Sequence, residues 1–157
     1  MSTIKVDTLQ TRSGNTAAVT GSGFVATDQI RGNTAANSVT VVGEGGTNTT
    51  NLQQGLAKSW VNWDGTGTVS VRDSFNPSSL TDNATGDYTI TITAAMSNTN
   101  YCRSGMAGQA ANSQEVISQC QDTTPATTTV ARYVNAYQNG TLEDPEYVGV
   151  VLHGDLA

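Results

Sequence analysis

Tyr88-Thr89-Ile90-Thr91-Ile92-Thr93 is the stretch that decides the fold of this chain. Large apolar residues alternate strictly with threonine, which is the pattern of a β-strand with one buried face and one solvated face. The preceding segment, Asn83-Ala84-Thr85-Gly86-Asp87, has the composition of a turn. We therefore expect an antiparallel, all-β structure built around this strand.

Further strands are predicted on both sides of this stretch. Residues 147–153 are almost entirely apolar, so we expect a strand that is buried on both faces. Asn139-Gly140 is typical of a hairpin turn leading into it. The polar residues 109–125 are expected to form a loop. Residues 59–157 are therefore predicted to fold as a small antiparallel β-sandwich or jelly-roll-like domain, with its other strands at residues 68–73, 100–106 and 127–137.

The composition agrees with a solvated β-protein. The chain has 157 residues, of which 25 are Thr, 13 Asn and 16 Gly, and only 13% are charged. Thr suits exposed strand faces, whereas Asn and Gly suit turns. The net charge is −6 and the seven cations are scattered, which argues against binding to nucleic-acid phosphates. An apolar run of about 18 residues is lacking and the polar start is unlike a signal peptide, so we expect cytoplasmic synthesis without membrane insertion.

The N-terminal segment 1–20 is predicted to be a docking arm. Ile4 and Val6 alternate with polar residues, and Leu9 follows on. This strand pattern has no neighbouring strand along the sequence with which to form a hairpin. We therefore expect its partner to come from far along the chain or from another protein.

Segment 21–58 is predicted to be a linker that becomes ordered on oligomerisation. Gly-Asn-Thr-Ala-Ala begins at Gly14 and again at Gly32, and large apolar residues are sparse throughout residues 11–50. Ordering each residue costs about 1–2 kcal/mol of backbone entropy. Because the segment cannot build its own core, contacts with other chains must supply the compensation.

One short helix is expected near residues 50–60. Leu52, Leu56 and Trp60 recur at every fourth position, which places them on one helical face. A helix this short is marginal alone. Leu52 and Leu56 could meet around the axis of a homotrimer, or the helix could lie on the sheet of its own domain.

Residues able to do chemistry are present, but each has an ordinary structural explanation. The acids lie mostly in turn sequences, where Asp bonds to nearby backbone. His153 and Asp155 would share one face of a strand, although a nucleophile motif is lacking. Residues 82–87 lack the spacing of a calcium loop, and Cys102 and Cys120 match no zinc pattern, which favours free thiols. We expect no catalytic residue, metal or cofactor; the acids considered are Asp64, Asp73, Asp82, Asp87, Glu143, Asp144 and Asp155.

Aromatic residues are the remaining candidates for ligand contact. Trp60 and Trp63 are three residues apart, so on one strand they point to opposite faces, and we expect them in a core or an interface. Tyrosines of the later strands and loops are the better candidates for stacking on sugars. These are Tyr101, Tyr133, Tyr137 and Tyr147.

Three parts of the sequence are distinctive strings. The first is the start, Ser2-Thr-Ile-Lys-Val-Asp-Thr-Leu-Gln-Thr-Arg-Ser-Gly14. The second is a middle block that includes Gly55-Leu-Ala-Lys-Ser-Trp-Val-Asn-Trp-Asp-Gly-Thr-Gly67, Arg72-Asp-Ser-Phe-Asn76 and Leu80-Thr-Asp-Asn-Ala-Thr-Gly-Asp-Tyr-Thr89, and the third is the ending His153-Gly-Asp-Leu-Ala157. Together they cover about half of the chain, and they resemble small fibre-type proteins of tailed bacteriophages, notably marine and cyanobacterial ones.

This resemblance implies a structural virion protein and supplies no catalytic residues. We expect a homotrimeric tail fibre or appendage that docks on other virion proteins by Ile4, Val6 and Leu9. Its β-domain would project outward, where it could serve host attachment. One alternative with the same parts is a capsid decoration (cement) protein on the head. Another is a module that binds a host-surface glycan.

Overall fold

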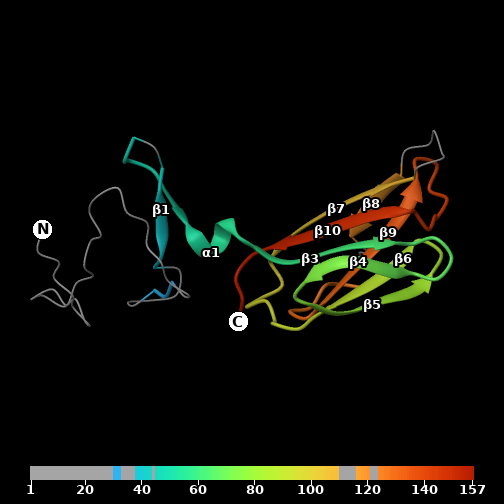
Figure 1. Ribbon diagram of the computed structural model, residues 1–157, viewed down its shortest axis with the longest axis horizontal. Helices are drawn as coiled ribbons and strands as arrows, with labels where there is room; N and C mark the ends of the chain where they lie inside the picture. The colour runs from blue at the N-terminus through green and yellow to red at the C-terminus, as the bar shows by residue number, and fades with distance from the viewer. Residues whose placement is uncertain (1–29, 33–37, 44, 110–115, 121–123) are drawn as a thin grey trace, which may run out of the picture. The chain divides into compact units, whose positions relative to one another are not determined.

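A computed structural model describes residues 30–32, 38–43, 45–109, 116–120 and 124–157 (Figure 1). The chain divides into two compact units, residues 1–31 and 32–157. Every helix and strand described below belongs to the second unit.

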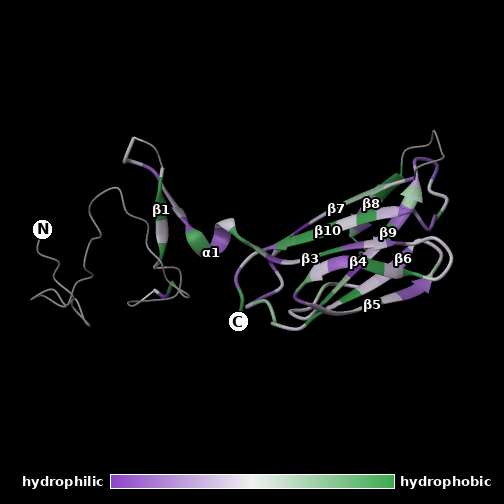
Figure 2. Cartoon of the chain, viewed as in Figure 1, coloured by the Kyte–Doolittle hydropathy of each residue, from purple (hydrophilic) through white to green (hydrophobic). Residues whose placement is uncertain are grey.

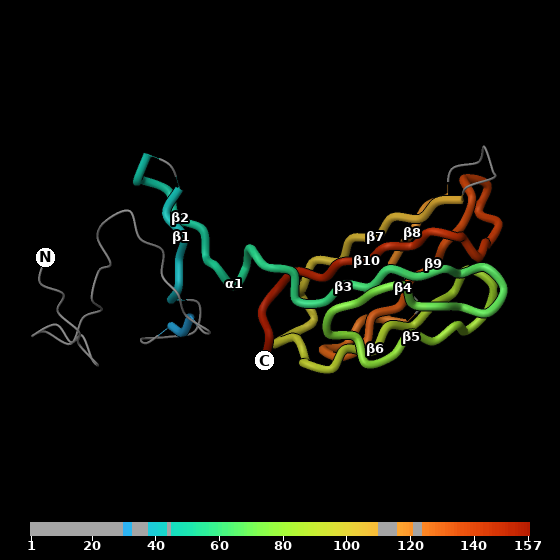
Figure 3. Tube along the Cα trace, in the orientation of Figure 1, coloured from blue at the N-terminus to red at the C-terminus, as the bar shows by residue number. Residues whose placement is uncertain are grey.

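Eight strands of the second unit form two four-stranded antiparallel sheets, which confirms the all-β sandwich. The first sheet has the order β4-β3-β10-β7 and the second β5-β6-β9-β8. Consecutive strands pair within one sheet at β3–β4, β5–β6 and β8–β9, and the chain path between the sheets can be followed in Figure 3. The strands are β3 (Ala57–Asp64), β4 (Ser70–Phe75), β5 (Pro77–Ala84), β6 (Asp87–Ile92), β7 (Cys102–Gly108), β8 (Val116–Cys120), β9 (Val130–Tyr137) and β10 (Tyr147–His153).

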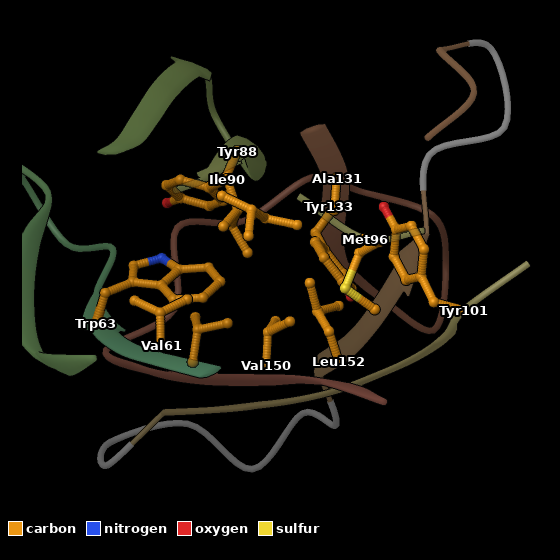
Figure 4. Packing of buried hydrophobic residues seen from close by; sticks show 12 residues of the cluster. Val61, Trp63, Tyr88, Ile90, Met96, Tyr101, Ala131, Tyr133, Val150 and Leu152 are labelled. Carbon is orange, nitrogen blue, oxygen red and sulfur yellow. The ribbon is translucent and has the colours of Figure 1, made fainter. Parts of the chain in front are cut away.

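The core lies between the two sheets (Figure 4). The deciding stretch forms β6, whose Tyr88, Ile90 and Ile92 are buried while the threonines between them are half-buried. The Trp63 indole meets the Tyr88 ring edge-on, with 5.4 Å between ring centroids. The buried cluster comprises Val61, Trp63, Tyr88, Ile90, Ile92, Met96, Tyr101, Ala131, Tyr133, Val148, Val150 and Leu152.

One residue carries the chain from the first sheet to the second. Asn76 separates β4 from β5 and has a φ of 73°, in the left-handed region that Asn tolerates better than most residues. Its side-chain Nδ2 donates to the carbonyl oxygens of Lys58 and Ala94, at 2.8 and 3.2 Å, and its Oδ1 accepts from the Ala94 N–H at 2.7 Å. These three bonds fix the corner to both neighbouring segments.

The segment before the sandwich contains a small hairpin and a helix of one turn. Strands β1 (Thr40–Val42) and β2 (Thr49–Asn51) pair antiparallel, and α1 (Leu52–Gly55) follows directly. The Asn51 side chain caps the helix by accepting from the Gln54 N–H at 3.0 Å. The predicted helical face is wrong beyond Gly55, because Leu56 is already extended and Trp60 lies in β3.

Three other expectations from the sequence need correction. Strand β8 lies inside residues 109–125, which were predicted to be a loop. Strand β10 is fully buried on one face only, since Gly149 and Val151 on the other face are half-buried. Asn139-Gly140 does form a turn, with Gly140 at a φ of 83°. It does not pair β9 with β10, however, because these strands belong to different sheets.

Candidate functional site

The β1–β2 hairpin leaves its apolar side chains uncovered. Val41 and Val42 are 53% and 56% exposed, and Figure 2 shows the hydrophobic colour of β1. They pair with Thr50 and Thr49, which are also exposed. A two-stranded hairpin is marginal in water without further packing. The hairpin is therefore a candidate contact surface for other chains.

Leu52 and Leu56, the predicted trimer-axis residues, differ in their surroundings. Leu52 is half-buried within α1, whereas Leu56 follows the helix and is 54% exposed. Because the shared helical face is lost, the two leucines do not form one continuous stripe along a helix. An axis role for either residue stays a prediction.

A buried lysine anchors α1 to the start of the sandwich. Lys58 is only 4% exposed. Its Nζ donates to the Leu56 carbonyl oxygen at 2.9 Å and also to the Gln53 carbonyl oxygen. Burial lowers the pKa of Lys58, and the charge of Asp155 partly opposes this. The Asp155 carboxylate in turn accepts from Gln54 Nε2 at 2.6 Å, so the C-terminal segment is also tied to α1.

The predicted docking residues Ile4, Val6 and Leu9 lie outside the described residues. Their docking role stays a prediction.

The outer face of the first sheet, which we call the apolar outer face, is a second candidate surface. Phe75, Trp60 and Val151 lie opposite one another on β4, β3 and β10. Phe75 is 54% exposed, and Trp60 and Val151 are half-buried. In the next row, Asn62, Gly149 and Met106 lie side by side on β3, β10 and β7. An open hollow beside Gly149 is lined on this face by Trp60, Asn62, Ser104, Met106 and Val151. Its other lining residues are Val61, Arg103, Gly105, Val150 and, from β8 of the second sheet, Ser118.

Two acids considered for catalysis, Asp64 and Asp144, make hydrogen bonds in turns and loops of the sandwich. Asp144 Oδ1 accepts from the Gly86 N–H at 2.6 Å and from the Tyr88 hydroxyl at 2.7 Å. Asp64 accepts from the Thr66 N–H and hydroxyl and from Arg72, and the Thr66 hydroxyl bond is the first cause that lowers its pKa. These are the bonds of turns and loop anchors.

Asp87 belongs to an ion pair on the outer face of the second sheet. Its carboxylate accepts from Arg132 Nε at 2.7 Å and also from Arg132 Nη2. The Arg132 hydrogen bond lowers the pKa of Asp87. Asn83 Nδ2 donates to the same carboxylate at 3.3 Å and to the Thr89 hydroxyl at 2.8 Å. Residues 82–87 are thus the end of β5, a two-residue turn and the first residue of β6, with Gly86 of the turn at a φ of 70°.

The remaining acids are spread over separate segments. Asp73 accepts from the N–H of Ser74 at 2.8 Å, Asp82 lies exposed in β5, and Glu143 accepts from Gln109 Nε2. His153 ends β10, so Asp155 lies beyond the strand and the expected shared strand face is wrong.

The tyrosines divide between core and surface. Tyr101 and Tyr133 are core residues, 8% and 1% exposed, so the prediction that they form a glycan surface is wrong. Tyr137 is half-buried, and its hydroxyl donates to Gln109 Oε1 at 3.2 Å. Tyr147 is 47% exposed, but the Arg72 guanidinium lies over its ring, 4.8 Å from the centroid.

The tryptophans and cysteines agree with the expectations. Trp63 is fully buried, while Trp60 points to the opposite face, as their spacing predicted. Cys102 is exposed and Cys120 half-buried, and both are free thiols.

Within the described ranges, no three His, Cys, Asp or Glu side chains gather in a way that could hold a metal ion. The same ranges contain no helix that is long and apolar enough to cross a membrane. Comparisons of the chain with protein-family models, with curated proteins and with solved structures find no match.

Proposed function

We propose that this chain is a non-catalytic structural subunit of a tailed-bacteriophage virion, a homotrimeric fibre or appendage. In this proposal the N-terminal arm docks on other virion proteins, and the sandwich of residues 59–157 projects outward, where it can serve host attachment. The hairpin and α1 lie between these two parts and mediate contact between copies.

The observation that carries the proposal is the exposed apolar hairpin. Val41, Val42 and Leu56 are each more than half exposed in the isolated chain. Burying apolar area contributes about 25 cal/mol per Å², so association that covers these side chains is favourable. The resemblance of the start, middle and end of the chain to phage fibre-type proteins supports the virion setting. A subunit whose exposed apolar side chains become buried only by contact with other copies is suited to a virus particle built from many copies.

The structural bonds of the acids support a non-catalytic role. Asp64 and Asp144 hold turns, and Asp87 is paired with Arg132. A decoration protein of the head would use the same arm and sandwich, so it remains the second candidate.

Two measurements test the proposal. Light scattering on the purified full-length chain gives its mass, and the proposal requires three times the 16.3 kDa of one chain. Immunogold labelling of the virions of a phage that encodes the chain then locates it. Label on the tail supports a fibre, label on the head supports a decoration protein, and unlabelled virions would refute both.

Deletion of residues 1–20 tests the docking arm. We expect the truncated protein to remain folded and to be lost from purified virions. Incorporation at the normal level would show that docking does not use Ile4, Val6 and Leu9.

A further inference from the structure

The two outer faces of the sandwich differ in chemistry at their centres. On the second sheet, the ion pair between Asp87 and Arg132 lies beside Thr89 and Thr91, with the half-buried Val130 and Val134 on either side of Arg132. On the first sheet, the corresponding centre consists of Trp60, Val151 and Gly149. An aromatic centre with a polar rim is typical of protein interfaces.

The apolar outer face combines projecting side chains with a depression. Met106 is 80% exposed and Phe75 54% exposed, and they lie on the two edge strands. Gly149 lies on the interior strand β10, contributes no side chain and is one of the residues that line the hollow. A Cβ at Gly149 would meet only Asn62 Nδ2, at 3.8 Å. The hollow therefore has room for an aliphatic side chain from another segment.

The distribution of charge along the chain favours the N-terminal segment over a second sandwich domain as the occupant of the apolar outer face. Residues 1–12 carry two cations, Lys5 and Arg12, and one anion, Asp7. The sandwich segment, residues 57–157, carries four cations and ten anions. Two sandwich domains therefore repel each other, whereas the N-terminal segment is attracted to the rest of the chain. Asp73, an exposed acid on the rim beside Asn62, adds to this attraction, whereas Arg103, which also lines the hollow, opposes it.

The same segment has suitable apolar residues and sufficient reach. Ile4 and Val6 fall on one side of its strand pattern, and Leu9 follows. The described structure starts at Ile30, and the 29 residues before it could span about 95 Å when extended. In an oligomer, the arms of neighbouring copies are present at high local concentration.

We propose that the apolar outer face binds residues 3–9 of a second copy of this chain, with Ile4 or Val6 seated over Gly149 between Trp60 and Met106. This inference rests on the proposed oligomeric function and names a contact between copies in addition to that of the hairpin and α1. It would leave fewer arms for docking on other virion proteins, because an arm bound to a sister subunit is not available elsewhere.

Methionine oxidation on the full-length chain tests the contact, because oxidation follows exposure. Met106 is the probe, and Met96, which is 1% exposed, is the internal reference for an intact core. The chain is treated with dilute hydrogen peroxide, and peptide mass spectrometry measures the rate at each methionine. Four proteins are compared: the natural sequence, Ile4→Asn/Val6→Asn, Gly149→Val and the control Thr3→Asn, which alters the opposite side of the same strand pattern.

We expect Met106 in the natural sequence and in Thr3→Asn to oxidise about tenfold more slowly than in the other two variants. A Cβ at Gly149 would meet only Asn62 Nδ2, at 3.8 Å, so we expect Gly149→Val to keep an intact core and Met96 to oxidise slowly in it. Dilution below the association range should accelerate Met106 oxidation in the natural sequence, because the covering arm belongs to a second copy.

Three outcomes would overturn the inference. Equal protection of Met106 in all four proteins would mean that something other than the arm covers the face. Fast oxidation in all four would mean that the face is bare. Protection that survives dilution to monomer would assign the covering arm to the same copy. Light scattering on the same samples distinguishes failure of this inference from failure of the proposed function. A trimer in which Met106 is oxidised freely would overturn only the contact between the arm and the apolar outer face.

Discussion

Replacing Gly86 by alanine should be among the most damaging single-methyl additions to this sandwich. Gly86 turns the chain between β5 and β6 at a φ of 70°. A Cβ there would lie 2.4 Å from the Asn135 carbonyl oxygen and 2.9 Å from the Glu143 backbone nitrogen and oxygen. All three neighbours are backbone atoms, which cannot swing aside as a flexible side chain would.

The size of the stability loss follows from the conformation and the hydrogen bonds that must be strained to make room for the Cβ. The left-handed conformation costs a residue with a Cβ about 1–2 kcal/mol. Moving the turn away strains the bond from the Asn135 N–H to the Gly86 oxygen, 2.7 Å, and the bond from the Gly86 N–H to the Asp144 carboxylate, 2.6 Å. A neutral bond contributes about 1 kcal/mol and one to a charged group about 1.5–3 kcal/mol. We expect a total loss of about 4 kcal/mol in the free energy of unfolding.

Gly140→Ala is the matched control, because Gly140 has a φ of 83° but no atom within 4 Å of its Cβ position. It should lose only the conformational part, about 1–2 kcal/mol. Urea unfolding at one fixed protein concentration, followed by tryptophan fluorescence, gives both values. With a slope of about 2 kcal/mol per molar, Gly86→Ala should lower the midpoint by about 2 M. Equal losses for the two variants would refute the steric argument.

Three further predictions concern the site and its supports. Tyr88→Phe removes the bond to Asp144 and should lower the free energy of unfolding by about 1–3 kcal/mol in the same urea assay; an unchanged midpoint would contradict this. Burial raises the pKa of Tyr88 above 10.0, so the neutral Tyr88 side chain contributes its full stability below that pH and less as the pH rises. The loss of unfolding free energy at alkaline pH should therefore be smaller in Tyr88→Phe than in the natural sequence. The Arg132 hydrogen bond lowers the pKa of Asp87 below 3.8, so the ion pair contributes its full stability above that pH and loses it as the pH falls. Asp87→Asn should therefore make the melting temperature fall less steeply with decreasing pH. The same acid dependence in the variant and in the natural sequence would count against a contribution from the ion pair. Val42→Asp should shift the light-scattering mass towards the monomer while leaving the sandwich melting temperature unchanged.

The strands that the sequence predicted best are those in which apolar and polar residues alternate without interruption. Strand β6 has three apolar residues on its inner face and threonine on the other, and it lies in the interior of its sheet. Strand β5 was missed because Pro77-Ser78-Ser79 begins it and because only Leu80 packs against the core. Strand β8 was missed because its inner positions include Ser118, whose polarity gives no alternation signal.

The helix prediction failed because a period of four can arise by chance across two elements. Leu52 belongs to α1, Leu56 to the connection and Trp60 to β3. Residues from Ala57 onward gain the ladder bonds to β10 and β4, which exceed what one extra helical turn containing Gly55 would provide. The tie from Lys58 to the end of α1 could not be predicted, since Lys side chains are rarely buried.

Strand β10 has a more apolar sequence than its burial within a single chain requires. Its run Val148-Gly149-Val150-Val151-Leu152 has the continuous apolar character of a strand covered on both faces. The sandwich covers Val148, Val150 and Leu152 completely and leaves Val151 half-buried. Val151 is thus one of the apolar side chains that the proposed arm of a second copy would cover.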